Sequence, residues 1–242
     1  MLGKRADRKP HEPWSLEQLR ADMNDTGIAD ALVRQAWSRD VDPALGNEEL
    51  TRAIAGIDSL HGCWSILPPA TGELAEPDPF IKAMLGRNVS AAVAYPRAQT
   101  FSLAAWSIGK ILRSLESHRI PFLLPFEQSN WEEVEALCGT YVYLPIIVTD
   151  LNYRQLRFLL PLWEKFQNLF VDLSWFSIHD GLAALADRKR LGQVLFGTRY
   201  PQFEPGAAVS MVTYANISLE EKERVAGGTL RGLLKAIRRD VR

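Results

Sequence analysis

The sequence predicts an α/β fold, a TIM-like (β/α)8 barrel of which seven strands can be read. Short β-rich runs alternate with longer amphipathic stretches, as in parallel βα units. The runs 146–148 and 169–171 are apolar on both faces, as expected for strands between a barrel interior and outer helices. An open, doubly wound sheet is the alternative. No Gly-rich phosphate loop follows any expected strand, and the glycine-containing run 227–232 lies inside a helical pattern, so the barrel is favoured.

The expected elements alternate along nearly the whole chain. Strands are expected at residues 31–36, 62–67, 90–95, 121–126, 144–149, 169–173 and 193–197. Helices are expected at residues 15–25, 47–58, 78–87, 103–118, 130–139, 154–166, 180–191 and 218–238. Two helix starts have the capping-box form, Ser15 with Gln18 and Ser218 with Glu221, in which both side chains satisfy free backbone amides.

Length and composition fit one barrel-sized domain. The 242 residues are 47% hydrophobic, and we expect a polar segment at 1–14 followed by a single barrel domain at 15–242. A net charge of -1 directs no field toward nucleic acid or an anionic membrane. The N-terminus lacks the apolar region of a signal peptide, so a cytoplasmic protein is expected. Cys63 and Cys138 have no spaced partner, which favours reduced, buried thiols.

Several segments carry motifs of a known family. Residues 193–201 read Gln-Val-Leu-Phe-Gly-Thr-Arg-Tyr-Pro, and residues 218–229 form a helix start that ends in Gly-Gly-Thr. These segments, with residues 168–174 and 19–33, resemble the last strand, the closing helix, the penultimate strand and the first helix and second strand of the amidohydrolase-related family. The resemblance covers the chain from residue 14 to residue 238. It implies a TIM-barrel metal hydrolase or a decarboxylase-like member, with zinc or another divalent metal at the barrel mouth.

The family's metal ligands do not carry over to this chain. The family uses an early His-x-His, a His after the fifth strand, a His after the sixth and an Asp after the eighth. Arg199 stands in the position of that Asp and has no lone pair for a metal. Pro125 stands in the position of one His, and Asp150 replaces the other. The early His-x-His has no counterpart, either because the sequence starts after it or because strand one was lost. We therefore expect strand one to be missing or atypical, no metal site and no cofactor.

Charged residues are expected at the strand ends that form the barrel mouth. They are Arg97, Glu127, Asp150 and Arg199. In one interpretation they form structural ion pairs, and Arg199 lies beside Asp150 as a tethered substitute for the metal cation. In the other, Arg97 and Arg199 bind a carboxylate or phosphate ligand. Aromatic residues would then form the walls of the pocket: Tyr95, Tyr153, Trp175 and Tyr200.

Acid–base chemistry without a metal would need other residues. Asp150, Glu127 and His179 are the candidates, although packing before the next helix explains His179 equally well. Asp172 is expected to have a hydrogen-bonding role in the core. The other histidines, His11, His61 and His118, are expected to have surface or capping roles.

Three functions remain open. The favoured one is a metal-free pseudoenzyme that lacks ordinary hydrolase chemistry and binds a small ligand or a protein partner at the barrel mouth. The second is an active hydrolase or decarboxylase-like enzyme with a rebuilt site. The third is a structural subunit, in which a homodimer or pairing with an intact paralogue protects the strand edges beside a missing strand one. Residues 1–14 would be an alternative cover for these edges.

Overall fold

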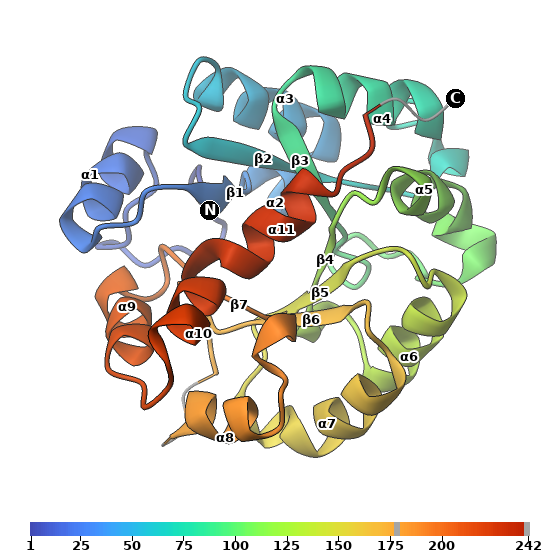
Figure 1. Cartoon of the computed structure of the whole chain (residues 1–242). Coiled ribbons are helices and arrows are strands. Elements are labelled where there is room, and N and C mark those ends of the chain that lie inside the picture. The colour runs from blue at the N-terminus through green and yellow to red at the C-terminus, as the bar shows by residue number, and fades with distance from the viewer. Residues whose placement is uncertain (177–179, 240–242) are drawn as a thin grey trace.

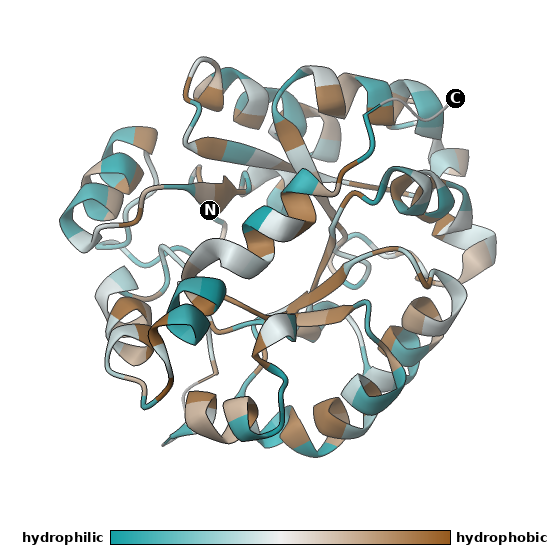
Figure 2. Cartoon of the chain, in the orientation of Figure 1, coloured by the Kyte–Doolittle hydropathy of each residue, from teal (hydrophilic) through white to brown (hydrophobic). Residues whose placement is uncertain are grey.

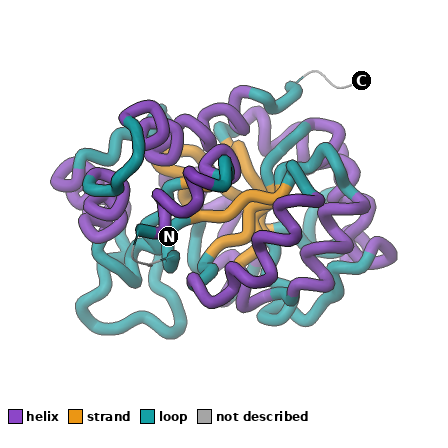
Figure 3. Tube along the Cα trace, turned by 60° about the horizontal axis from the view of Figure 1, so that its bottom comes forward, coloured by secondary structure: helices purple, strands orange, loops and turns teal. Residues whose placement is uncertain are grey.

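A curled sheet of seven parallel strands forms the centre of the molecule (Figure 1). The computed structural model describes residues 1–176 and 180–239. The strands pair in chain order and are β1 (Ala31–Val33), β2 (Leu60–Ser65), β3 (Val89–Val93), β4 (Phe122–Pro125), β5 (Ile146–Thr149), β6 (Leu169–Asp172) and β7 (Val194–Leu195). Figure 3 shows these strands gathered in the middle, with helices around them. The α/β, TIM-like architecture and all seven expected strands are confirmed.

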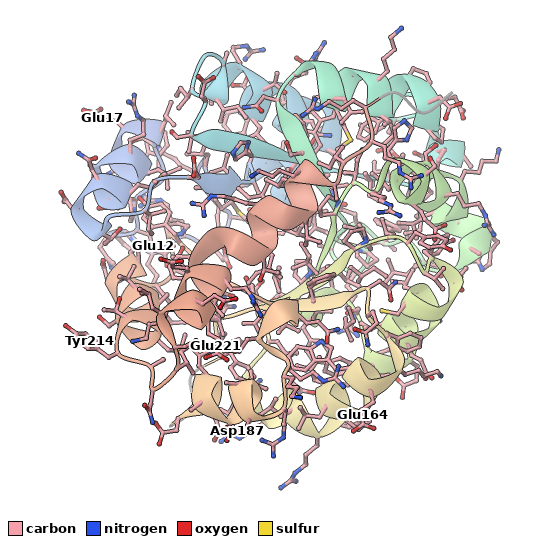
Figure 4. All side chains as sticks on the ribbon, viewed as in Figure 1. Glu12, Glu17, Glu164, Asp187, Tyr214 and Glu221 are labelled. Atoms are coloured by element: carbon pink, nitrogen blue, oxygen red, sulfur yellow. The ribbon has the colours of Figure 1, made fainter. Side chains whose placement is uncertain are left out.

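Helices surround the strands, all but the last of them on the outside. They are α1 (Leu16–Thr26), α2 (Trp37–Asp40), α3 (Pro43–Ile54), α4 (Pro77–Gly86), α5 (Ala105–His118), α6 (Trp131–Thr140), α7 (Leu156–Lys165), α8 (Gly181–Asp187), α9 (Pro205–Thr213), α10 (Leu219–Glu223) and α11 (Thr229–Lys235). The capping boxes at Ser15 and Ser218 are both formed. Figure 4 shows Glu17, Glu164 and Asp187 on the outer helices, away from the barrel centre. In the part of the chain that the structure describes, no helix has the length and apolar character needed to cross a membrane.

The barrel interior is a packed apolar cluster. It contains Cys63, Ala91, Val93, Tyr95, Leu123, Ile147 and Leu195. Leu230 and Leu233 of α11 pack against this cluster, and in Figure 1 α11 crosses the middle of the view in front of the strands. Figure 2 shows hydrophobic residues concentrated on the strands and polar residues on the outer helices. Helix α11 therefore acts as part of the barrel core.

The C-terminal region differs from the single helix expected at 218–238. A π-helical turn, Arg224–Gly228, separates α10 from α11, and Gly227 has a non-helical backbone there. The break lets α11 turn onto the barrel interior. Helix α9 was not expected, since its segment contains Gly206 and has no charged face.

The barrel is open on one side, where β1 and β7 form the two edges of the sheet. Strand β1 ends at Val33 rather than at residue 36, because the chain beyond it leaves β2 and pairs with Leu2. The Leu2 amide donates to Arg34 O (2.7 Å) and the Ala36 amide to Leu2 O (2.7 Å), while the Met1 amino group donates to Tyr200 O (2.8 Å). Residues 1–2 thus bridge the two edges at one end. We call the remaining gap the seam.

Candidate ligand site at the barrel mouth

A cavity of about 490 Å³ runs from the mouth of the barrel into the seam. Its polar end contains side chains that follow the C-terminal ends of four strands: Arg34, Asp150, Asp172, Ser174 and Arg199. Barrel active sites lie at this end because loops from different strands converge there. A cavity of this size fits a small-molecule ligand.

An ion pair between Asp150 and Arg199 crosses the mouth. Arg199 Nε lies 2.8 Å from Asp150 Oδ1, and both side chains are about 15% exposed. The Nε–H does not point at the carboxylate, so this contact is ionic and lacks good hydrogen-bond geometry. Both residues have left-handed backbones, with φ of 62° and 53°. Such backbones cost about 1–3 kcal/mol each and persist only where the surroundings hold them.

Aromatic rings hold the Arg199 guanidinium in place. It lies 4.3 Å from the ring centroid of Trp175 and 5.3 Å from that of Phe203. Stacking of a cation on ring faces is favourable, more so when water is partly excluded. The predicted position of Arg199, directly beside Asp150, is therefore confirmed. The rings of Trp175 and Phe203 and the carboxylate of Asp150 restrain the Arg199 guanidinium from three sides.

Asp172 connects the two parts of the polar end. Its Oδ1 accepts hydrogen bonds from the Asp150 amide (3.2 Å) and from Ser174 Oγ (2.8 Å). Burial, followed by the charge of Asp150, raises the pKa of Asp172 to about 7, although the Ser174 hydrogen bond opposes this. The expected hydrogen-bonding role of Asp172 is present. Its place in the cavity lining and its pKa near neutrality depend on tertiary contacts and were not expected.

Arg34 is the functional residue that the sequence reading missed. It follows β1, is partly buried and lines the cavity, and within residues 1–176 and 180–239 it forms no ion pair within 4.0 Å. Burial disfavours its charge, but interactions with Tyr95 and Asp150 outweigh burial and raise the pKa of Arg34. Burial raises the pKa of Tyr95, and the charge of Arg34 and a hydrogen bond with Arg34 oppose this rise. Arg34 is therefore a fixed cation that faces the cavity.

The other predicted residues are divided between the mouth and its surroundings. Tyr200 lines the cavity, whereas Tyr153 and Trp175 lie outside it and are 41% and 46% exposed. Arg97 lies away from the cavity, since its guanidinium donates to the carbonyls of Glu127 (2.8 Å) and Ser129 (2.6 Å). The exposed Glu127 side chain is not part of the cavity lining either.

The histidines do not add to the polar end of the site. His179 lies outside the described residues. His61 belongs to β2, not to the segment before it, and lines the end of the cavity away from the mouth. His118 ends α5, where its Nδ1 lies 2.9 Å from Ser114 O.

The residues at the mouth do not fit the divalent metal that the family resemblance implies. Across the described residues, no group of three His, Cys, Asp or Glu side chains is placed to hold an ion. Pro125, at the end of β4, has no metal-binding atom in its side chain, and the carboxylate of Asp150 is already paired with Arg199. A structural or catalytic zinc site needs at least three protein ligands. The donor set here therefore favours an anion over a cation.

Comparisons with known proteins agree with the barrel architecture. No protein-family model matches the sequence, and no curated protein does. Among solved structures, an uncharacterised TIM-barrel protein from Bordetella bronchiseptica has a TM-score of 0.72 at 16% identity, over 92% of this chain and 83% of that one. The 5-carboxyvanillate decarboxylase of Sphingomonas paucimobilis has a TM-score of 0.65 at 12% identity, over 90% and 82%. The 2,6-dihydroxybenzoate decarboxylase from Rhizobium has 0.64 at 13%, over 93% and 90%.

These similarities define the class of the fold. The chain is a TIM-like α/β barrel, and its structural neighbours include another TIM-barrel protein and two decarboxylases. At such low identity the likeness extends to the fold alone. The function has to be inferred from the residues at the mouth.

The pKa of Asp172 predicts how the stability depends on pH. Unfolded, this carboxyl loses its proton near pH 3.8, whereas the folded protein holds it until about pH 7. Stability therefore falls as pH rises through this window. The amide of Asp172→Asn does not titrate, so this variant should not lose stability in this way. From pH 4 to pH 8, its free energy of unfolding should fall by roughly 1–3 kcal/mol less than that of wild type. Urea unfolding at both pH values measures the difference, and an equal change at both would contradict the assignment.

Proposed function

We propose that this protein binds a small carboxylate at the barrel mouth, without a metal and without ordinary amidohydrolase chemistry. The observation that carries the proposal is the Arg34 guanidinium, which faces the cavity with no anionic partner within 4.0 Å in the described residues. A partly buried cation without a counter-ion is costly unless a ligand pairs with it. An arginine also presents several donors in a planar fork, which matches the geometry of a carboxylate.

The neighbouring charges leave Arg34 available for a ligand. Arg199 neutralises Asp150 directly at 2.8 Å. Asp172 has a pKa of about 7 and is partly protonated at neutral pH, so it competes only weakly for Arg34. The mouth therefore has one ion pair, one carboxyl that is largely neutral below pH 7, and one cation in excess.

Arg34→Met tests this proposal. Methionine keeps the length of the side chain and removes its charge and donors. A charge-assisted hydrogen bond contributes about 1.5–3 kcal/mol, so we expect affinity for a bound carboxylate to fall at least roughly tenfold. Binding of acetate, benzoate and hexanoate can be followed by amide NMR shifts of the cavity residues.

Arg154→Met is the matched control, because Arg154 is exposed and lies outside the cavity lining. It should leave carboxylate affinity unchanged. The proposal fails if none of the three acids binds wild type, or if both arginine variants weaken binding equally.

Acid–base catalysis at the same mouth is a second candidate. It is supported by the pKa of Asp172 near 7, since a group that titrates near the working pH transfers protons efficiently. Two of the fold relatives are decarboxylases by name. Release of CO2 from 2,6-dihydroxybenzoate by wild type, and its loss in Asp172→Asn, would favour this candidate. If wild type releases no CO2, the second candidate has no support with this substrate.

A further inference from the structure

We infer that the carboxylate ligand has an aliphatic chain, which lies in the seam between β1 and β7 while its head group pairs with Arg34. This inference rests on the proposed function and specifies the ligand class. Its basis is the continuity of the cavity, which joins the charged mouth to a region between the edge strands β1 and β7 where aliphatic side chains are frequent.

Aliphatic side chains from four elements line much of the seam, beside charged side chains of α1 and α11, namely Asp22, Arg231 and Lys235. The aliphatic side chains are Leu19 and Met23 of α1, Leu32 of β1, Leu195 of β7, and Leu230 and Leu234 of α11. Leu19, Met23 and Leu195 are each less than 10% exposed, yet each contributes surface to the cavity. Such a lining is complementary to a hydrocarbon chain, because transfer of apolar surface from water is favourable.

The polar and apolar regions lie at successive positions along the same strand. Leu32 lines the seam and Arg34 follows two residues later, so both side chains project to the same face of the extended chain. Residues 1–2 bridge Arg34 and Tyr200 above the seam. A ligand with its head at Arg34 would therefore extend its tail past Leu32 toward α11.

The lining favours an aliphatic over an aromatic acid. Among the described residues, the rings that line the cavity are those of Phe196 and Tyr200 and the imidazole of His61, whereas many more of its lining residues are Leu, Ile or Val. The aromatic rings of Trp175 and Phe203 are instead occupied with Arg199. Stacking partners for an aromatic ligand are therefore few, whereas branched aliphatic side chains are abundant.

A chain-length series tests this inference. Calorimetric titration of the wild-type protein with butanoate, hexanoate and octanoate at pH 7 should show affinity rising about fourfold for each added methylene, the factor that corresponds to burial of one CH2 group. 1-Octanol, which has the chain without the charge, should bind at least tenfold more weakly than octanoate.

Leu234→Gln should reduce the gain in affinity per methylene between butanoate and octanoate. Leu219→Gln is its control, because Leu219 is 72% exposed on α10 and outside the cavity lining. If Leu234→Gln does not fold, the chain-length series with the wild-type protein still tests the inference. If affinity does not rise with chain length, or if benzoate binds more tightly than hexanoate, the inferred aliphatic chain is wrong and the proposed function still stands. Absence of binding by every acid would overturn both.

Discussion

Asp150→Ala is expected to lower the free energy of unfolding by about 2–4 kcal/mol, because it leaves the partly buried Arg199 without its anion. Arg34, a second cation, faces the same cavity. Loss of the Asp150 charge should also lower the pKa of Asp172, since that charge helps to raise it. Ionised Asp172 would then offset part of the loss. Urea unfolding at pH 7 measures the net change.

The double variant Asp150→Ala/Arg199→Met shows whether the two residues act as a pair. If they do, the double variant should lose roughly 1–2 kcal/mol less stability than the sum of the losses of the two single variants. The exposed pair Lys165–Glu135, at 2.7 Å with side chains 61% and 48% exposed, is the control. Its coupling should stay below about 1 kcal/mol. Additive effects at Asp150 and Arg199 would show that their proximity contributes little.

Gly46→Ala is expected to destabilise the protein by about 3 kcal/mol. Gly46 lies in α3, and a Cβ there would collide with the backbone nitrogen and Cα of Ser38 in α2. Ser38 in turn donates from its hydroxyl to Gln35 O (2.6 Å) and accepts from the Gln99 side chain (2.7 Å). The contact therefore supports the segment that carries Arg34, and the variant should weaken carboxylate binding as well as stability.

Gly86→Ala provides the control for this substitution. Gly86 ends α4, and a Cβ there would have no neighbour within 4 Å. Stability should stay the same or rise by up to about 1 kcal/mol, because alanine reduces the entropy of the unfolded chain. Thermal unfolding of both variants gives the comparison. Equal effects would mean that the close packing of α2 on α3 is not what makes Gly46 necessary.

Local patterns predicted the strands better than the path of the C-terminal region. The strand runs are apolar and bounded by turn residues, so their positions follow from local chemistry. Whether α11 continues from α10 depends on tertiary packing: Leu230 and Leu233 are stabilised by the barrel interior, and the break at Gly227 makes this contact accessible. Both segments have a helical pattern, so periodicity alone predicts one continuous helix.

The candidate site was predicted in part. The exchange of a metal ligand for Arg199 indicated an ion pair with Asp150, which the structure contains. Arg97 is a different case, because backbone carbonyls at residues 127 and 129 hold its guanidinium away from the cavity. Arg34 was missed because it was read as part of a continuous strand at 31–36. Its position depends on where β1 ends, which the long-range pairing of Leu2 determines.

Metal content tests the central claim, that an arginine–carboxylate pair and a free arginine replace the metal at this mouth. The protein would be expressed with zinc and manganese in the medium, dialysed without chelator and measured by elemental analysis, alongside Asp150→Asn. We predict well under one divalent ion per chain, roughly 0.1 or less, in both proteins, because three suitable ligands are lacking. About one ion per chain in wild type, lost in Asp150→Asn, would contradict the account.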